Sequence, residues 1–191
     1  MLDNAIVYVF GTDHDLQCGD VRRQRISSIH IQQYQDAIQS VIESKKIRII
    51  FEEWHPTVRE QTSYNNTLLQ TWYSDTEFAP HHIDLSREDR ARIGCSRECI
   101  NIQMHLKAFF DNQEQSESVC PKDPRKTTTD CDCELLVDEI RERVWVSRIR
   151  KKNIWPALLV CGSNHTVKVH DLFGRFGVKS NILYRDFGKI P

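Results

Sequence analysis

The segment from Pro156 to Gly177 constrains the fold more than any other part of the sequence. It opens with a short apolar run, Ala157 to Cys161, whose length and composition are typical of a buried strand. Gly162 ends the run, and apolar residues then recur with the spacing of one helix face: Val169, Leu172, Phe173 and Phe176. The segment predicts a strand, a turn and a helix, with His165 in the turn. In open α/β sheets, ligands bind at that edge.

The beginning of the chain repeats this arrangement. The apolar run from Ala5 to Phe10 is followed by Gly11, Thr12, Asp13 and His14. A Gly-x-x-His turn therefore occurs twice, each time directly after a strand-like run. The repetition indicates a site rather than two unrelated turns. Because parallel strands end at the same edge of a sheet, we expect His14 and His165 to lie at that edge.

The rest of the sequence alternates between strand and helix patterns. Further strands are expected at residues 47–51, 81–85 and 178–184, and helices at residues 26–46, 58–72, 87–93, 98–110 and 134–152. This alternation predicts an α/β fold with a mostly parallel central sheet and helices on both faces. The length of 191 residues fits a single domain spanning residues 1–191.

One stretch departs from this pattern. Residues from about 95 to 133 include a long run of Gln, Ser, Thr, Pro and charged residues that predicts a polar insertion in an exposed loop. The stretch also carries cysteines, and Cys95, Cys99, Cys131 and Cys133 are candidates for a structural zinc site. Scattered thiols are the favoured alternative, since the spacings match no familiar zinc motif.

Charge and composition narrow the classes of partner. The formal net charge of -1 gives no electrostatic reason to expect nucleic acid or an anionic membrane. The sequence has neither an apolar run of membrane-spanning length nor a segment of signal-peptide type. The odd number of cysteines, seven, favours a reducing compartment. We expect a cytoplasmic protein, and the sequence leaves the oligomeric state open.

Acidic residues follow the second expected strand. Glu52 and Glu53 end it, and His14 and His165 follow two other strands, so the fold should bring these side chains together. Two imidazoles and a carboxylate form a ligand set for a divalent metal such as Zn, Mn or Co, with an open position for water. A spare carboxylate could act as general base. The alternative is two turn histidines bonded to backbone and two exposed glutamates.

Further polar residues stand near the same expected edge. Asp84 ends the third strand and His55 follows the second, so both are candidate additional site residues. On the helix expected at residues 134–152, Arg141 and Arg148 share the apolar stripe, where an unpaired charge would be costly. For Arg148 we expect the guanidinium group to reach water. For Arg141, pairing with a carboxylate or an anionic ligand and reaching water with the alkyl stem buried remain equally open.

Taken together, these residues resemble the TraB/Tiki superfamily, which includes the erythromycin-esterase and ChaN branches. The resemblance rests on the two Gly-x-x-His turns, the glutamate that closes the second strand, and the helix piece at residues 141–146, Arg-Glu-Arg-Val-Trp-Val. It implies an α/β fold with one central cleft. In that cleft His14, Glu52 or Glu53, Arg141 and His165 would form the site, and Asp84 could join it.

The sequence also departs from the family pattern. Trp145 stands where the family usually has Met, the doubled Glu52 and Glu53 leave the acid ambiguous, and the cysteine-bearing residues 95–133 have no counterpart that we can name. Activities differ among the branches of the superfamily, so the resemblance does not fix one.

The function expected is a metal-dependent hydrolase acting on peptide or ester bonds, with a peptide or small molecule as substrate. His14 and His165 would be metal ligands, Glu52 or Glu53 would ligate the metal or act as base, and Arg141 would hold a developing oxyanion or a substrate carboxylate. The alternative is a non-catalytic ligand-binding or regulatory protein that reuses the same cleft.

Overall fold

The computed structural model describes residues 5–19, 26–55, 66–86, 89 and 133–188, with side chains from residue 138 onward in the last range. The chain divides into two compact units. One comprises Met1–Asp84 with Trp145–Pro191, and the other comprises Leu85–Val144. The first unit contains the whole described sheet. The helices expected at residues 58–72, 87–93 and 98–110 fall wholly or partly outside the described residues, as does nearly all of the polar stretch at 95–133.

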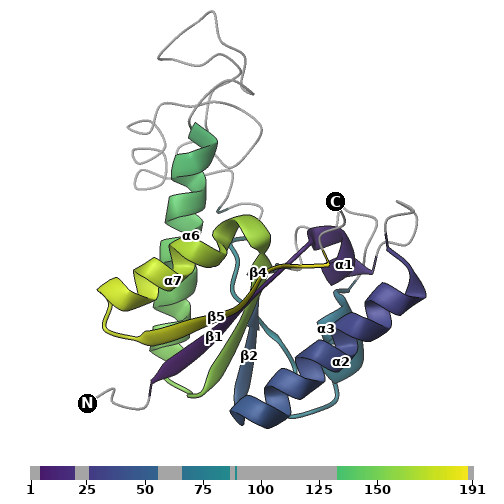
Figure 1. The fold of residues 1–191 in the computed structure, drawn as a ribbon. Helices are drawn as coiled ribbons and strands as arrows, with labels where there is room; N and C mark the ends of the chain where they lie inside the picture. Colours follow the sequence, from purple (N-terminus) through teal and green to yellow (C-terminus); the bar gives the residue numbers. More distant parts are fainter. Residues whose placement is uncertain (1–4, 20–25, 56–65, 87–88, 90–132, 189–191) are drawn as a thin grey trace, which may run out of the picture. The chain divides into compact units, whose positions relative to one another are not determined.

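The first unit is built on a five-stranded parallel sheet (Figure 1). The strands are β1 (Ile6–Thr12), β2 (Ile49–Glu52), β3 (His81–His82), β4 (Ala157–Gly162) and β5 (Lys179–Phe187). Their order in the sheet is β3-β2-β4-β1-β5. The predicted α/β fold with a largely parallel sheet is confirmed, and every strand ends at the same edge.

Helices cover both faces of this sheet, as predicted. The helical elements are α1 (His14–Cys18), α2 (Ser28–Lys45), α3 (Leu68–Tyr73), α6 (Cys133–Lys152), the short 3-10 helix η4 (Ser163–His165) and α7 (Thr166–Arg175). Figure 1 shows α2 and α3 on one side of the sheet and α7 with the C-terminal part of α6 on the other. The short helix α1 was not predicted. It begins after Asp13, whose side chain accepts a hydrogen bond from the Asp15 N–H.

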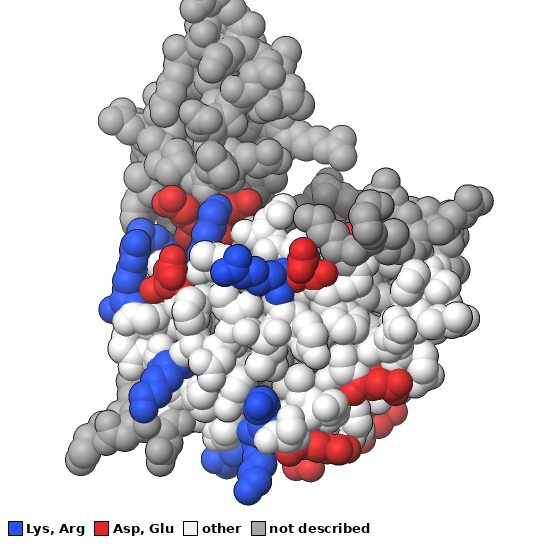
Figure 2. Space-filling view, viewed as in Figure 1, with Lys and Arg blue, Asp and Glu red and all other residues white. Residues whose placement is uncertain are grey.

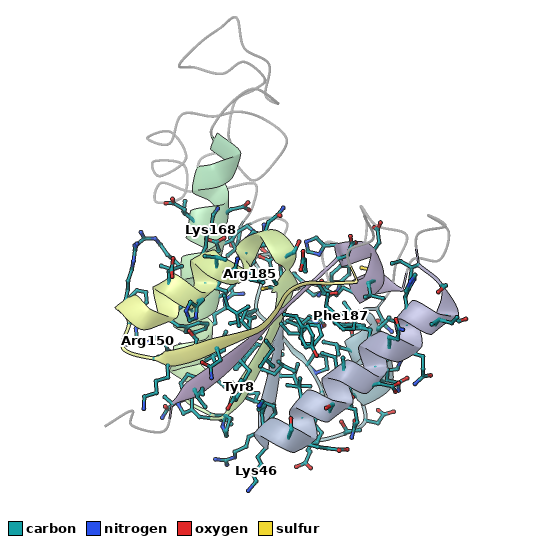
Figure 3. The ribbon with its side chains drawn as sticks, in the orientation of Figure 1. Tyr8, Lys46, Arg150, Lys168, Arg185 and Phe187 are labelled. Atoms are coloured by element: carbon teal, nitrogen blue, oxygen red, sulfur yellow. The ribbon has the colours of Figure 1, made fainter. Side chains whose placement is uncertain are left out.

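Alternating strand residues build a separate core on each face. On β4, Ala157, Leu159 and Cys161 pack against α6 and α7, whereas Leu158 and Val160 pack on the side of α2 and α3. All residues of β4 are buried, which explains its continuous apolar run. Phe187 of β5 joins the second core, with its ring centroid 5.2 Å from that of Phe10 and 5.9 Å from that of Tyr34 (Figure 3).

The third strand is shorter than the expected segment at 81–85. Beyond His82 the chain still bonds to its neighbours, because the Ile83 N–H donates to the Glu52 carbonyl at 3.0 Å. Arg148 of α6 also holds this segment: Nη1 donates to the carbonyls of Ile83 at 3.0 Å and Asp84 at 2.7 Å. The guanidinium group of Arg148 is thus an anchor for the end of β3, which corrects the expectation that it only reaches water.

A substitution at Gly11 tests the parallel packing of β1. A Cβ there would collide with the carbonyl oxygen of Arg185 and with Cγ2 of Thr166, whereas a Cβ at Gly174 of α7 meets nothing within 4 Å. We expect Gly11→Ala to lower the free energy of unfolding by about 1–3 kcal/mol or more. Gly174→Ala should raise it by up to ~1 kcal/mol. Urea denaturation measures both, and equal effects of the two substitutions would contradict the packing described.

Candidate functional site

The register of the sheet brings the ends of three strands together. β4 lies between β1 and β2, with Thr12 opposite Gly162 and Glu52 opposite Val160. The pairing with β4 continues one residue beyond β2, because the Glu53 N–H donates to the Val160 carbonyl at 2.9 Å. The segments that carry His14, Glu53 and His165 therefore leave three adjacent strands at one edge.

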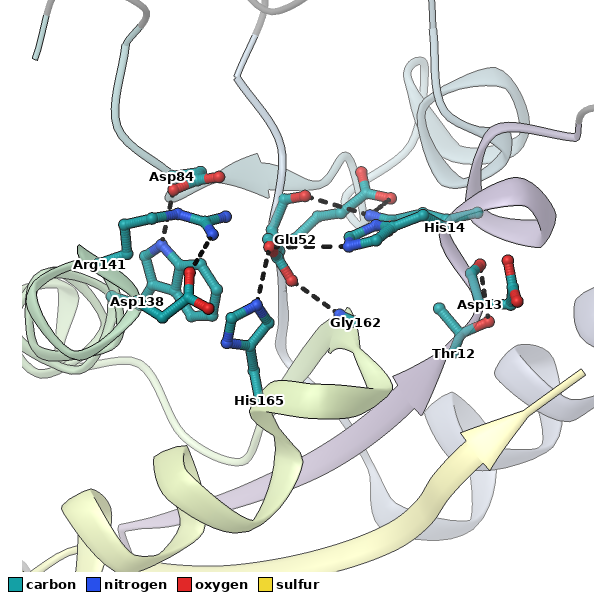
Figure 4. Close-up of polar contacts among 12 residues, drawn as sticks. Thr12, Asp13, His14, Glu52, Asp84, Asp138, Arg141, Gly162 and His165 are labelled. Atoms are coloured by element: carbon teal, nitrogen blue, oxygen red, sulfur yellow. Dashed lines mark hydrogen bonds and ion pairs between the residues drawn. The ribbon is translucent and has the colours of Figure 1, made fainter. Parts of the chain in front are cut away.

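Glu53 is at the centre of the candidate site, since it contacts Gly162, His165 and His14. Figure 4 shows these three residues together with Glu52. Its side chain is only 3% exposed. Oε2 accepts a hydrogen bond of 2.7 Å from the Gly162 N–H. Oε1 lies 3.5 Å from His165 Nε2 and 3.9 Å from His14 Nε2. One carboxylate oxygen is thus held by the backbone, and the other faces both imidazoles.

The two histidines differ in their surroundings. The His165 side chain is 7% exposed, whereas that of His14 is 58% exposed. The His165 ring packs edge-on against Trp145, with centroids 5.0 Å apart, and Trp145 Nε1 donates to Asp84 Oδ1 at 3.0 Å. His165 is therefore fixed from inside the protein, and His14 forms the solvent-facing side of the group.

Gly162 makes room for this arrangement. A Cβ at that position would lie 2.7 Å from His14 Nε2 and 3.3 Å from Glu53 Oε2. Any side chain would push His14 away from the carboxylate. The glycine of the second Gly-x-x-His turn is thus required by a close approach, in agreement with the importance that the sequence pattern gives it.

Glu52 takes part in a different network. It is fully buried, its Oε1 accepts from Gln17 Nε2 at 3.0 Å, and its Oε2 accepts from Thr67 Oγ1 at 2.8 Å. His82 Nε2 lies 3.7 Å from Oε2. Burial raises the pKa of the Glu52 carboxyl to about 7, although the two hydrogen bonds oppose that shift. Of the doubled glutamates, Glu53 faces His14 and His165.

The other predicted site residues have different places. Asp84 is buried and accepts the hydrogen bond from Trp145, and His55 is partly exposed after β2. Neither is among the partners of Glu53 described above. Arg141 belongs to the second unit, where its Nη1 pairs with Asp138 Oδ1 of α6 at 2.8 Å. Its role toward an anionic ligand stays a prediction.

The expected zinc cysteines fall largely outside the described residues. Cys95, Cys99 and Cys131 lie there, and Cys133 is the first residue of α6. Where side chains are described, no group of three or more His, Cys, Asp or Glu is found that could hold a metal ion as the side chains stand.

Sequence reasoning missed the polar residues behind the site. Gln17 and Thr67 are fully buried and bind the carboxylate of Glu52. Gln17 follows His14 by three residues, a spacing that places both on one helix face, and this spacing is a signal present in the sequence. Thr67 carries a weaker signal, because it also caps α3 by accepting from the Gln70 N–H.

Figure 2 shows charged side chains of both signs on one face of the molecule. Among the described residues of this face, Lys and Arg lie near Asp and Glu and are separated by uncharged surface. This distribution agrees with the formal net charge of -1 and indicates no broad field of one sign there. None of the described helices is both long and apolar enough to span a membrane.

Comparison with known proteins gives no relative for this chain: no family model, no curated protein and no solved structure matches it. The resemblance to the TraB/Tiki superfamily therefore rests only on the residues quoted above and stays a prediction.

The buried Glu52 carboxyl predicts a pH-dependent stability. Its pKa is about 7 in the folded protein and near 4.5 ordinarily, so the folded state binds more protons between these values and stability falls as pH rises through them. The substitution Glu52→Gln keeps the shape of the side chain and removes its charge. We expect this variant to be more stable than wild type above about pH 7, by up to ~3 kcal/mol, and the difference to shrink toward about pH 4.5.

Chemical denaturation of both proteins across this pH range measures the difference. The stability difference between the two proteins could instead stay the same from acid to neutral pH. That result would show that the Glu52 carboxyl does not titrate in this range, and would contradict its assignment as a desolvated carboxyl.

Proposed function

We propose that this protein is a metal-dependent hydrolase that cleaves peptide or ester bonds. The observation that carries the proposal is the convergence of two imidazole nitrogens on one oxygen of a buried carboxylate, Glu53, at the carboxyl edge of a parallel sheet. That edge is where α/β proteins place their ligands. The predicted resemblance to the TraB/Tiki superfamily is compatible with this class of activity but does not fix it.

The donor set suits a divalent metal. Two histidines and one glutamate hold the ion in some zinc hydrolases, and ligand atoms ~2.1 Å from a tetrahedral ion lie ~3.4 Å from one another. The separations of 3.5 Å and 3.9 Å from Glu53 Oε1 are close to that value. The longer one involves His14, the more exposed of the two histidines. Zn, Mn and Co all accept these ligands.

When bound, the ion would lower the pKa of a water molecule and polarise the scissile carbonyl group. The residues of the chain supply position and access. The Gly162 N–H holds one oxygen of Glu53, which leaves Oε1 to ligate or to accept a proton. His165 is held rigid against Trp145, and the exposed side of His14 is where a substrate can enter.

Glu52 is a poor candidate for the reacting base. Its two oxygens accept hydrogen bonds from Gln17 and Thr67, and it is fully buried. A general base must reach the proton that it removes. We therefore assign the reactive carboxylate to Glu53 and a supporting role to Glu52.

A second candidate is a non-catalytic binding or regulatory protein. The arrangement of the described side chains favours it in one respect: no group of them could hold a metal ion without some movement. In that case the contacts of His14 and His165 with Glu53 would be structural ion pairs that shape a binding cleft.

Metal content separates the two candidates. Purified wild-type protein loaded with Zn, Mn or Co should retain about one ion per chain by elemental analysis, and His14→Ala, His165→Ala and Glu53→Gln should each weaken binding by ~100-fold or more. His170→Ala removes a histidine that bonds Ser180 on β5, and serves as the matched control with wild-type metal content.

The same proteins are then assayed with a panel of esters and peptides. Turnover that needs the ion and disappears in the three site variants supports the hydrolase. An ion retained in the His14→Ala/His165→Ala double variant would belong elsewhere, and metal without turnover would favour the binding protein.

A further inference from the structure

Gln17 connects the Glu52 carboxylate, the Glu53 backbone and His14. It is fully buried on α1, one turn after His14. Its Nε2 donates to Glu52 Oε1 at 3.0 Å and to the Glu53 backbone carbonyl at 3.4 Å. Its Oε1 lies 3.2 Å from His14 Nδ1. A single amide thus bridges three residues of the site.

The orientation of this amide follows from its partners. A backbone carbonyl can only accept a hydrogen bond, and so can an ionised carboxylate. The nitrogen of Gln17 must therefore point to Glu53 and Glu52. The carbonyl of Glu53 imposes this orientation by itself, whatever the protonation state of Glu52, because it has no proton to give. The Gln17 oxygen is then left facing His14.

That oxygen fixes the proton on His14. An amide oxygen accepts but never donates, so the His14 nitrogen facing it, Nδ1, must carry the hydrogen. In a neutral imidazole the other nitrogen then has a lone pair. This nitrogen is Nε2, which faces Glu53 Oε1 at 3.9 Å. The chain of hydrogen bonds thus runs from the Glu53 carbonyl through Gln17 to the histidine.

We infer that Gln17 is a positioning residue that holds neutral His14 in the Nδ1-protonated tautomer, with the Nε2 lone pair turned toward Glu53. The value of this tautomer rests on the proposed function, since a metal ligand or a base needs a lone pair at that position. In metal sites generally, a hydrogen-bond acceptor on the ring nitrogen that does not bind the metal orients the histidine.

The tautomer can be read directly by NMR, without metal or substrate. In metal-free protein labelled with ¹⁵N histidine, long-range proton–nitrogen spectra at about pH 8 distinguish the protonated from the bare nitrogen of a neutral ring. We expect wild-type His14 to be protonated at Nδ1. A wild-type ring protonated at Nε2 would overturn the inference, and this test needs no variant to fold.

The variant Gln17→Met keeps the length of the side chain and removes the three hydrogen bonds of the amide, to Glu52, to the Glu53 carbonyl and to His14. His14 should then lose its single tautomer and show a mixture or the Nε2-protonated form. His170, whose Nδ1 lies 2.8 Å from Ser180 Oγ, is an internal reference whose signals should not move. Gln32→Met, at an exposed glutamine of α2 bonded to Asp36, is the matched control. An unchanged His14 tautomer in a folded Gln17→Met protein would refute the positioning role.

Metal titration of the Gln17→Met variant tests whether the tautomer of His14 supports metal binding. If the proposed function holds, Gln17→Met should weaken metal binding by ~10–100-fold, as loss of a partner behind a ligand usually does. Wild-type affinity in the variant would overturn the link between Gln17 and the metal. Absence of metal from wild type, with the tautomer as expected, would instead contradict the proposed function and support the assignment of the tautomer.

Discussion

The hydrogen bond from the Gly162 N–H to Glu53 Oε2 is the interaction on which the candidate site depends. It links the end of β4 to the residue after β2, and it offsets part of the cost of burying a carboxylate. It can form only because the two strands run parallel and in register, with Glu52 opposite Val160. The glycine at this position also leaves room for His14, because a Cβ at position 162 would lie 2.7 Å from His14 Nε2. The register of the parallel strands therefore sets the geometry of the site.

The doubled glutamates show how neighbouring residues of one type acquire separate roles. Adjacent residues of an extended chain point in opposite directions, so Glu53 reaches His14 and His165 whereas Glu52 reaches Gln17 and Thr67. Both carboxylates are buried. Gln17 joins the two networks through one amide, so a substitution of Gln17 can affect the exposed His14.

Much of the fold could be predicted from the sequence, because buried parallel strands give long apolar runs and their turns give glycines. The grouping of His14, His165 and a glutamate at one edge followed from the same reasoning. Which glutamate faces the histidines could not be predicted, since it depends on the residue at which β2 ends. Gln17 and Thr67 were missed because the burial of a polar residue depends on its hydrogen-bond partners in the folded protein, which the sequence pattern does not reveal. The place of β3 was predicted, but its length depended on bonds to Glu52 and Arg148.

The most direct test of the account is the position of a bound ion. Crystals grown with Zn or Mn should give one anomalous difference peak within coordinating distance, ~2.0–2.2 Å for zinc, of His14 Nε2, His165 Nε2 and Glu53 Oε1. The account predicts this peak at the carboxyl edge of β4, with Glu53 Oε2 still bonded to the Gly162 N–H. A peak only among the cysteines, or no peak at millimolar metal with the His14, His165 and Glu53 side chains ordered as described, would contradict it.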